Sequence, residues 1–429
     1  MSARRLHAVW LSLLKQVRFE RGHPDAAWSS FIAGSNDDWR VSGLGVNWWY
    51  TPAGLRKAKQ LALMYLDLRP DCGHYELRTI TALIFNTLQQ RCLDRSGVFS
   101  GVFAASEGSL FDRLLVNPAQ AALSLDDWMR EKINNDIGDS IAVYPLFRVI
   151  ASSEDLGFER LEIVRPDDAK RWAALDPRGG FERDWSPLTG QFVGGSGGGF
   201  QQPFDSWLVG RYRGSCEGIK QAFRRDAQEA MACLYAFWSR DAERERVMTS
   251  PEEYFLALHR PETGGARLHL LPLGPMFPRY GDELDLHSLQ PQVRDWNEKR
   301  RGLPAEYAKR LSTGLCFANL AMASYDVSIF INYFIVLDAL FGERGQVESS
   351  LVSGVSDVSG TERAGEMLPW LWSLRNDLMH GGSRNIHEWS SYLRYLKHFG
   401  TEPLSDLRAI ALNCLCRYPM VMSSKSMPP

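Results

Sequence analysis

The most informative set of side chains in this sequence is the octapeptide RNDLMHGG at residues 375–382. A planar guanidinium such as that of Arg375 can hold two phosphate oxygens at once, and the imidazole of His380 can take or give a proton near neutral pH. Asn376 adds a polar amide directly after the arginine. These residue types could therefore bind a phosphate and move a proton beside it.

The octapeptide is predicted to end a helix. A glycine pair follows His380, and apolar side chains recur at three- and four-residue spacing up to it. These apolar residues are Met367, Leu368, Leu371, Leu374 and Leu378. Asn376 and His380 are four residues apart and share a face, and the carbonyl groups of a helix end favour a protonated imidazole. Arg375 lies about 140° around the helix from His380, at about 100° per residue. It therefore approaches the histidine only through its long stem or across a subunit interface.

The spacing of arginine and histidine alone is a weak signal. The same five-residue step occurs at Arg18 and His23, where a proline follows the histidine. The copy at Arg375 differs because an asparagine follows the arginine, a glycine pair follows the histidine, and the surrounding sequence is helical. This context makes Arg375 and His380 candidate site residues.

The composition is that of a packed globular protein, with 45% hydrophobic and 11% aromatic residues among 429. Lysine and arginine number 49 against 51 acidic residues, so an RNA or DNA contact must rest on a local patch. One basic run is a candidate, but acidic residues interrupt it, which favours a solvated helical face. Its basic residues are Arg294, Lys299, Arg300, Arg301, Lys309 and Arg310.

The cysteine pattern and the lack of a leader indicate a cytoplasmic protein. Seven cysteines without a CxxC pair predict free thiols in a reducing compartment, not a disulfide frame or a zinc site. We expect neither a metal nor a cofactor. Residues 1–20 lack the apolar core and cleavage site of a signal peptide. The most apolar segment, 315–341, contains polar residues that are unfavourable in lipid, so no membrane contact is expected. These polar residues are Asn319, Asp326, Asn332 and Asp338.

The predicted fold class is α+β, with a mixed region at residues 1–300 and an all-helical domain at residues 304–420. A sub-boundary is predicted near residue 137, because the sequence before it reads as mainly helical. The helical patterns there cover 4–19, 53–68, 76–93 and 125–134. The stretch 43–52 is compatible with short strands or with packed loops.

The second part of the mixed region contains the strand patterns. Residues 140–151 and 158–164 read as two strands joined by a turn at 152–155, and residues 166–172 read as a helix that begins at a proline and two acids. A loop at 176–203 contains the glycine run 194–199, which favours a flexible linker over a phosphate-binding loop. The later patterns are a helix at 216–240 and strands at 254–259 and 266–272.

The helical domain contains five clear patterns and one weak segment. Helices are predicted at 305–324, 327–341, 364–380, 386–399 and 404–418. The serine- and glycine-rich segment 346–360 is the weakest element. A bundle of this size is an ordinary domain.

Two segments of this domain resemble a known family. The run FIVLDALF at 334–341, followed by LWSLRNDLMHG at 371–381, is similar to the C-terminal HEPN domain of Apea-type proteins. In that family a helix with an acidic residue precedes a helix that ends in Arg-Asn-x-x-x-His-Gly. The resemblance is most specific over these segments and extends over 304–418. The segment 140–166 is also similar to the end of the amino-terminal domain that is often fused to it.

The resemblance implies a metal-independent endoribonuclease in bacterial anti-phage defence or a toxin-like role. HEPN domains pair so that two motifs form one cleft, which implies a homodimer, an RNA substrate, and a phage-derived trigger or an antitoxin as partner. It places Arg375 and His380 on the catalytic motif, Asn376 on its polar second position and Asp338 on the acidic position of the preceding helix. Asp377 falls at an unconstrained position. The span between Phe341 and Leu368 is shorter and richer in serine than in relatives.

The chemistry is compatible with this implication, and other readings remain open. RNA cleavage by its own 2'-hydroxyl requires a base, a cation at the phosphorane and an acid for the leaving oxygen, which histidine and arginine can supply. Asn376 could orient the imidazole or bind the phosphate, and Asp338 could be a buried acid that anchors Arg375.

The alternative function is a non-catalytic HEPN module that binds nucleic acid or a protein partner. His380 would then be a helix-capping residue and Arg375 one half of a salt bridge inside the bundle. The tryptophans Trp48, Trp49, Trp370 and Trp372 are expected in the core rather than as base-stacking platforms. His387 and His398 are expected to be surface histidines.

Overall fold

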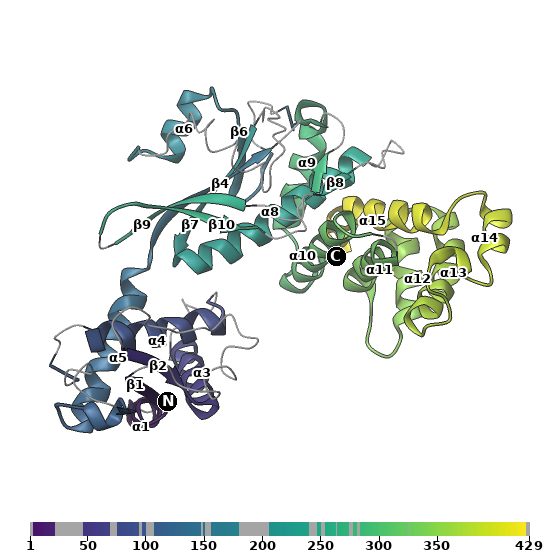
Figure 1. The fold of residues 1–429 in the computed structure, drawn as a ribbon. Coiled ribbons are helices and arrows are strands. Elements are labelled where there is room, and N and C mark those ends of the chain that lie inside the picture. Colours follow the sequence, from purple (N-terminus) through teal and green to yellow (C-terminus); the bar gives the residue numbers. More distant parts are fainter. Residues whose placement is uncertain are drawn as a thin grey trace, which may run out of the picture. The chain divides into compact units, whose positions relative to one another are not determined.

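The chain folds into a mixed α/β structure in which helices predominate (Figure 1). The computed structural model describes residues 3–21, 46–68, 75–93, 97–99, 107–146, 149–150, 156–179, 206–239, 247–249, 254–262, 264–273, 278–280, 284–325 and 327–425. The chain divides into two compact units. Unit 1 comprises Met1–Ser140, Arg213–Gln221 and His259–Ala266, and unit 2 comprises Ile141–Tyr212, Ala222–Leu258 and Arg267–Pro429. The domain boundaries expected near 137 and at 300–304 stay predictions.

Unit 1 packs helices around a small antiparallel sheet with the strand order β2-β1-β3. Its elements are α1 (Ala3–Leu14), β1 (Val17–Arg21), β2 (Val46–Tyr50), α3 (Pro52–Leu68), α4 (Leu77–Leu93), β3 (Glu107–Ser109) and α5 (Pro118–Asn135). A buried relay ties α1 to α3 and α5, because Trp10 Nε1 donates to the Tyr65 hydroxyl at 3.0 Å and that hydroxyl donates to Asp126 Oδ1 at 2.8 Å. The helix predicted to reach residue 19 is wrong at its end, since α1 stops at Leu14 and β1 follows.

A five-stranded sheet has the order β10-β9-β4-β7-β6. Its strands are β4 (Gly138–Leu146), β6 (Leu161–Val164), β7 (Ser206–Gly214), β9 (Tyr254–Pro261) and β10 (Arg267–Pro272). The strands predicted at 140–151 and 158–164 are confirmed in part as β4 and β6, which are not adjacent in the sheet because β7 lies between them. The turn predicted at 152–155 lies outside the described residues.

Two helices accompany this sheet. The predicted helix after Pro166 is confirmed as α6 (Ala169–Leu175), whose N-cap Asp168 accepts a hydrogen bond from the backbone N–H of Arg171. The predicted helix at 216–240 is confirmed as α8 (Cys216–Ser239), which packs on the sheet where the rings of Phe223 and Phe255 lie 4.6 Å apart. Short strand pairs join β5 (Val149–Ile150) to β12 (Leu284–Asp285) and β8 (Val247–Thr249) to β11 (Pro278–Tyr280).

From Ala305 to Lys425, every regular element that the structure describes is helical. The helices of this part and the one before it are α9 (Leu286–Arg301), α10 (Ala305–Met322), α11 (Val327–Phe341), α12 (Val347–Ser359), α13 (Glu362–Met379), α14 (Tyr392–Phe399) and α15 (Pro403–Lys425). Helix α15 contacts α10 to α13 (Figure 1). The weak segment 346–360 forms α12, and the helix predicted at 386–399 is wrong in its first half, which is a short 3-10 turn.

Buried side chains hold these helices together. Trp296 Nε1 on α9 donates to the backbone carbonyl of Leu415 on α15 at 3.0 Å. Gly314 on α10 allows α11 and α15 to approach closely, because an added Cβ would lie 3.3 Å from the side chains of Leu340 and Leu415. This packing supports α11 and α13, which carry the candidate residues.

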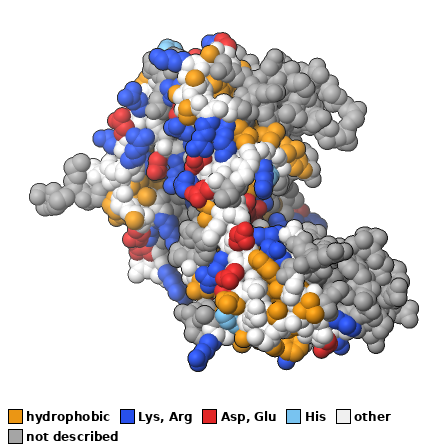
Figure 2. Space-filling view, turned by 90° about the vertical axis from the view of Figure 1, so that its left-hand side faces the viewer, with side chains coloured by type: hydrophobic (Ala, Val, Ile, Leu, Met, Phe, Trp, Pro, Cys, Tyr) orange, Lys and Arg blue, Asp and Glu red, His pale blue; other side chains and the backbone are white. Residues whose placement is uncertain are grey.

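Several expectations fall partly outside the described residues. They concern the glycine run 194–199, the turn 152–155, His23, Asp326, and the side chains of Trp48 and Trp49. Within the described part, five cysteines are free thiols, and no helix is both long and apolar enough to span a bilayer. The face drawn in Figure 2 mixes basic and acidic side chains, in keeping with a formal net charge of -2.

Candidate functional site

The octapeptide RNDLMHGG forms the C-terminal end of α13. The helix ends at Met379, and Gly381 adopts the left-handed conformation with φ 76°. The N–H of Gly382 donates to the carbonyl of Asp377 at 2.8 Å, and the N–H of Gly381 donates to that of Leu378 at 3.4 Å. This pair of bonds is a Schellman motif, in which glycine takes the position that other residues occupy only with strain. The helix end predicted from the glycine pair is confirmed.

Arg375 is half-buried and held on two sides. Its Nη1 donates to Asn376 Oδ1 at 3.0 Å, and its Cζ lies 5.3 Å from the centre of the Trp372 ring. Adjacent residues on a helix point in different directions, so the bond to Asn376 turns the guanidinium sideways across the helix surface. The face of Trp372 stabilises the cation from a second direction.

Arg375 lines a small pocket between α11 and α13. The pocket has a volume of about 70 Å³ and is also lined by Asp338, Trp372 and Met379. The rings of Phe334 and Trp372, 5.6 Å apart, connect the two helices beside it. The pocket therefore joins a guanidinium, a carboxylate and an aromatic ring.

Asp338 is exposed, which corrects the expectation of a buried acid that anchors Arg375. Both residues line the pocket and lie in the described part of the chain, where no salt bridge connects them. The reason lies in the period of α11, whose buried positions Phe330, Phe334, Leu337 and Phe341 follow one stripe. Asp338 lies about 70° around the helix from the middle of this stripe, at about 100° per residue, beside the pocket but open to water.

His380 is exposed and lies one residue beyond the last residue of α13. Its backbone N–H donates to the carbonyl of Asn376 at 3.0 Å, but its imidazole makes no hydrogen bond or ion pair to any residue that the structure describes. His380 does not line the pocket that contains Arg375. Thus Arg375 is bonded to Asn376 and shares a pocket with Asp338, whereas His380 does not line that pocket within one chain.

Asp377 and Ser383 are the residues of this region that sequence reasoning missed. Ser383 is buried, and its Oγ donates to Asp377 Oδ2 across the glycine pair. A Cβ at Gly382 would collide with the Asp377 carboxylate. Asp377 therefore fixes the chain that leaves the helix after His380. The sequence signal that could have predicted this bond is a serine six residues after an aspartate, with a glycine pair between them.

The neighbouring aromatic residues form a separate cluster. Trp370 is half-buried and stacks on His398, with ring centres 6.1 Å apart and an angle of 16° between the planes. Arg394 lies over the same tryptophan at 5.2 Å, and Tyr395 and Phe399 contact its edge. This cluster joins α14 to α13.

Among the described residues, no group of three or more His, Cys, Asp or Glu side chains is arranged to hold a metal ion. Comparisons of the chain with family models, with curated proteins and with solved structures found no match.

Proposed function

We propose that this chain is a metal-independent endoribonuclease of the HEPN kind. The single observation that carries the proposal is the end of α13. There a guanidinium fixed by Asn376 and Trp372 lies five residues before an exposed histidine whose imidazole makes no hydrogen bond to a described residue. The Schellman motif and the Ser383 hydroxyl hold the chain on either side of that histidine. The arrangement combines a rigid anion-binding group with an accessible proton-transfer group.

The proposed reaction is attack of a ribose 2'-hydroxyl on the adjacent phosphate. Arg375 uses one of its five N–H donors on Asn376, so other donors can bind the phosphate oxygens as negative charge develops. His380 takes the proton from the 2'-hydroxyl or gives one to the leaving 5'-oxygen. Asp338 lines the same pocket as Arg375 but forms no ion pair with it, so it is assigned no role in orienting the guanidinium. Balance requires a 2',3'-cyclic phosphate and a 5'-hydroxyl as products.

The proposal includes a homodimer. Arg375 and His380 lie on different sides of the end of α13, so a phosphate bound to Arg375 would receive its histidine from a second copy of the chain. We place the enzyme in anti-phage defence or a toxin-like role, activated by a phage-derived trigger or restrained by an antitoxin. The rival proposal, a non-catalytic module that binds RNA or a partner protein, shares the dimer but not the reaction.

The test compares Arg375→Ala and His380→Ala with the wild-type protein. Cleavage of labelled tRNA and mRNA is measured in the presence of EDTA, and product ends are mapped for a cyclic phosphate. Each variant is expected to fold, to remain a dimer by light scattering, and to lose at least about 100-fold in rate, which is the scale of one general acid–base contribution.

His387→Ala is the matched control, because His387 is also an exposed histidine just after α13, on the 3-10 turn Ile386–Glu388. It is expected to cleave at the wild-type rate. Wild-type cleavage that persists in Arg375→Ala and His380→Ala would exclude the enzyme. RNA binding without any cleavage by the wild-type protein would favour the non-catalytic module.

A further inference from the structure

The interrupted basic run at residues 294–310 is mostly exposed, as expected of a solvated face, but it also contributes to a pocket. Two of its members, Arg300 and Arg301, line a pocket of about 390 Å³ inside unit 2. Arg160 and Arg225 line the same pocket, so four arginines from three parts of the chain line it. The pocket lies between the loop before β6 and the helices α8, α9 and α10.

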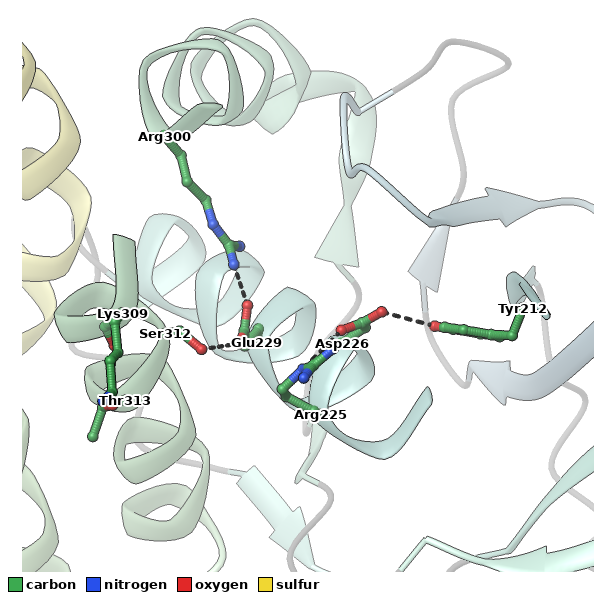
Figure 3. A network of polar contacts seen from close by, with 8 residues as sticks. All are labelled: Tyr212, Arg225, Asp226, Glu229, Arg300, Lys309, Ser312 and Thr313. Atoms are coloured by element: carbon green, nitrogen blue, oxygen red, sulfur yellow. Dashed lines mark hydrogen bonds and ion pairs between the residues drawn. The ribbon is translucent and has the colours of Figure 1, made fainter. Parts of the chain in front are cut away.

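Two acids in this pocket are already neutralised by internal bonds (Figure 3). Glu229 on α8 is 5% exposed and accepts hydrogen bonds from Arg300 Nη2 on α9 and from Ser312 Oγ on α10. Asp226 accepts from Arg225 Nε at 3.2 Å and from the Tyr212 hydroxyl at 3.1 Å. Each of these carboxylates therefore balances one arginine, and Arg160 and Arg301 have no ion-pair partner among the described residues.

The four arginines retain unused donors. A guanidinium carries five N–H groups, and the bonds shown for Arg225 and Arg300 use one nitrogen of each. Arg301 uses Nη2 to bind the carbonyl of Gly157 at 2.7 Å. Arg160 is exposed, and no bond of its guanidinium to another described residue is present.

The balance of charge in the pocket is positive. Four arginines face three acids, Glu159, Asp226 and Glu229, and the last two are held in the network already described. The ion pair with the buried Glu229 fixes Arg300, so at least one of the four arginines is held in place before any ligand binds. Such pre-organisation reduces the ordering that an anion would require on binding.

We propose that this pocket binds a small molecule that carries a phosphate group. Guanidinium groups match phosphate oxygens in pairs, and the unpaired Arg160 and Arg301 add two such groups to the spare donors of Arg225 and Arg300. The volume lies within the range of about 300–1,000 Å³ that small-molecule sites occupy, which is larger than a single inorganic ion needs. Phe158 and Leu303 supply an apolar wall for the rest of the ligand. The inference is independent of the proposed ribonuclease activity.

Calorimetric titration of the full chain tests the proposal with ribose 5-phosphate, AMP and ADP, and with adenosine as the uncharged probe. The phosphorylated probes are expected to bind saturably, inorganic phosphate is expected to compete with them, and adenosine is expected not to bind. The Arg160→Ala protein should bind AMP at least about tenfold more weakly, because one charge-assisted contact is lost. Arg301→Lys should weaken binding as well, since lysine keeps the charge but loses the fork.

Arg267→Ala is the matched control. Arg267 is exposed and begins β10, whereas Arg160 directly precedes β6, and these strands form opposite edges of the five-stranded sheet. The control should bind AMP like the wild-type protein. The proposal is overturned if no phosphorylated probe binds, if Arg160→Ala and Arg267→Ala bind AMP equally, or if adenosine binds as tightly as AMP. It is also overturned if only an RNA oligonucleotide depends on Arg160.

Discussion

Mixing two inactive variants tests whether Arg375 and His380 act across a subunit interface. The Arg375→Ala chain keeps His380, and the His380→Ala chain keeps Arg375. In a mixed dimer, the intact arginine and the intact histidine therefore lie on different subunits. If the reacting pair forms between subunits, the mixed dimer regains activity. If the pair forms within one subunit, no chain has both residues and no activity returns.

The structure favours recovery. Arg375 lines the pocket of α11 and α13, whereas His380 lies outside it, one residue past the helix end. Five residues of helix separate them by about 7.5 Å along the axis and about 140° around it. Equal co-expression of the two chains makes about half of the dimers mixed, and each mixed dimer keeps half of the pairs. We therefore expect about one quarter of the wild-type rate.

The assay is cleavage of a quenched fluorescent RNA by co-expressed chains that carry different affinity tags. Two-step purification of the mixed dimer should raise the recovery to about one half of the wild-type rate. Each variant co-expressed with itself controls for wild-type contamination. Purified mixed dimers that cleave no faster than those controls would refute the pairing between subunits, even if the single variants had confirmed both residues.

Two further predictions concern the supports of the two sites. Ser383→Ala should lower the free energy of unfolding by about 1–2 kcal/mol in urea denaturation, because it leaves the Asp377 carboxylate without its hydroxyl donor. The control Ser373→Ala, at an exposed position on α13, should change the free energy of unfolding by less than about 0.5 kcal/mol. Equal effects of the two substitutions would mean that the bond does not secure the helix end. Burial raises the pKa of Asp226 above its ordinary value of 3.8, so the folded protein binds this proton more tightly than the unfolded chain, and stability from this group falls as pH rises from 3.8 through the folded pKa. The free energy of unfolding of Asp226→Asn should therefore rise relative to that of the wild type as pH rises through this window. Urea denaturation at about pH 3.5 and about pH 7 measures both values. An advantage of the variant that shrinks as pH rises would contradict the raised pKa of Asp226.

The sequence predicted the end of α13 well because two local signals agreed. The apolar spacing placed Met367, Leu368, Leu371 and Leu374 on one face, and all four are buried. The glycine pair supplied the stop, and Gly381 has the positive φ that such a stop requires. Leu378 is only half-buried, because it belongs to the last turn, where the chain leaves the bundle.

The features that the sequence could not predict depend on distant parts of the chain. Strand β7 separates β4 from β6, and strand order in a sheet depends on long-range pairing that local patterns do not encode. The partners of Arg300 and Arg301 lie on α8 and in the loop before β6, so a charge count along residues 294–310 could not reveal the pocket. The error at Asp338 has another cause. The helical period of α11 already indicated an exposed position, but a buried acid was expected there because of its proposed role beside Arg375.

The contacts of Asn376 bear on the two roles considered for it. Its Oδ1 accepts from Arg375 Nη1, whereas the imidazole of His380 makes no hydrogen bond to a described residue, so Asn376 holds the guanidinium rather than the imidazole of its own chain. The amide N–H groups remain donors and can add to the phosphate contacts of the guanidinium. In the proposed mechanism, each subunit thus contains a prepared anion site, fixed by Asn376 and Trp372, before RNA binds. In the proposed dimer, the histidine needs no such support within its own chain, because the partner subunit already holds the phosphate. This division explains why Arg375 is half-buried and bonded while His380, five residues later, is exposed.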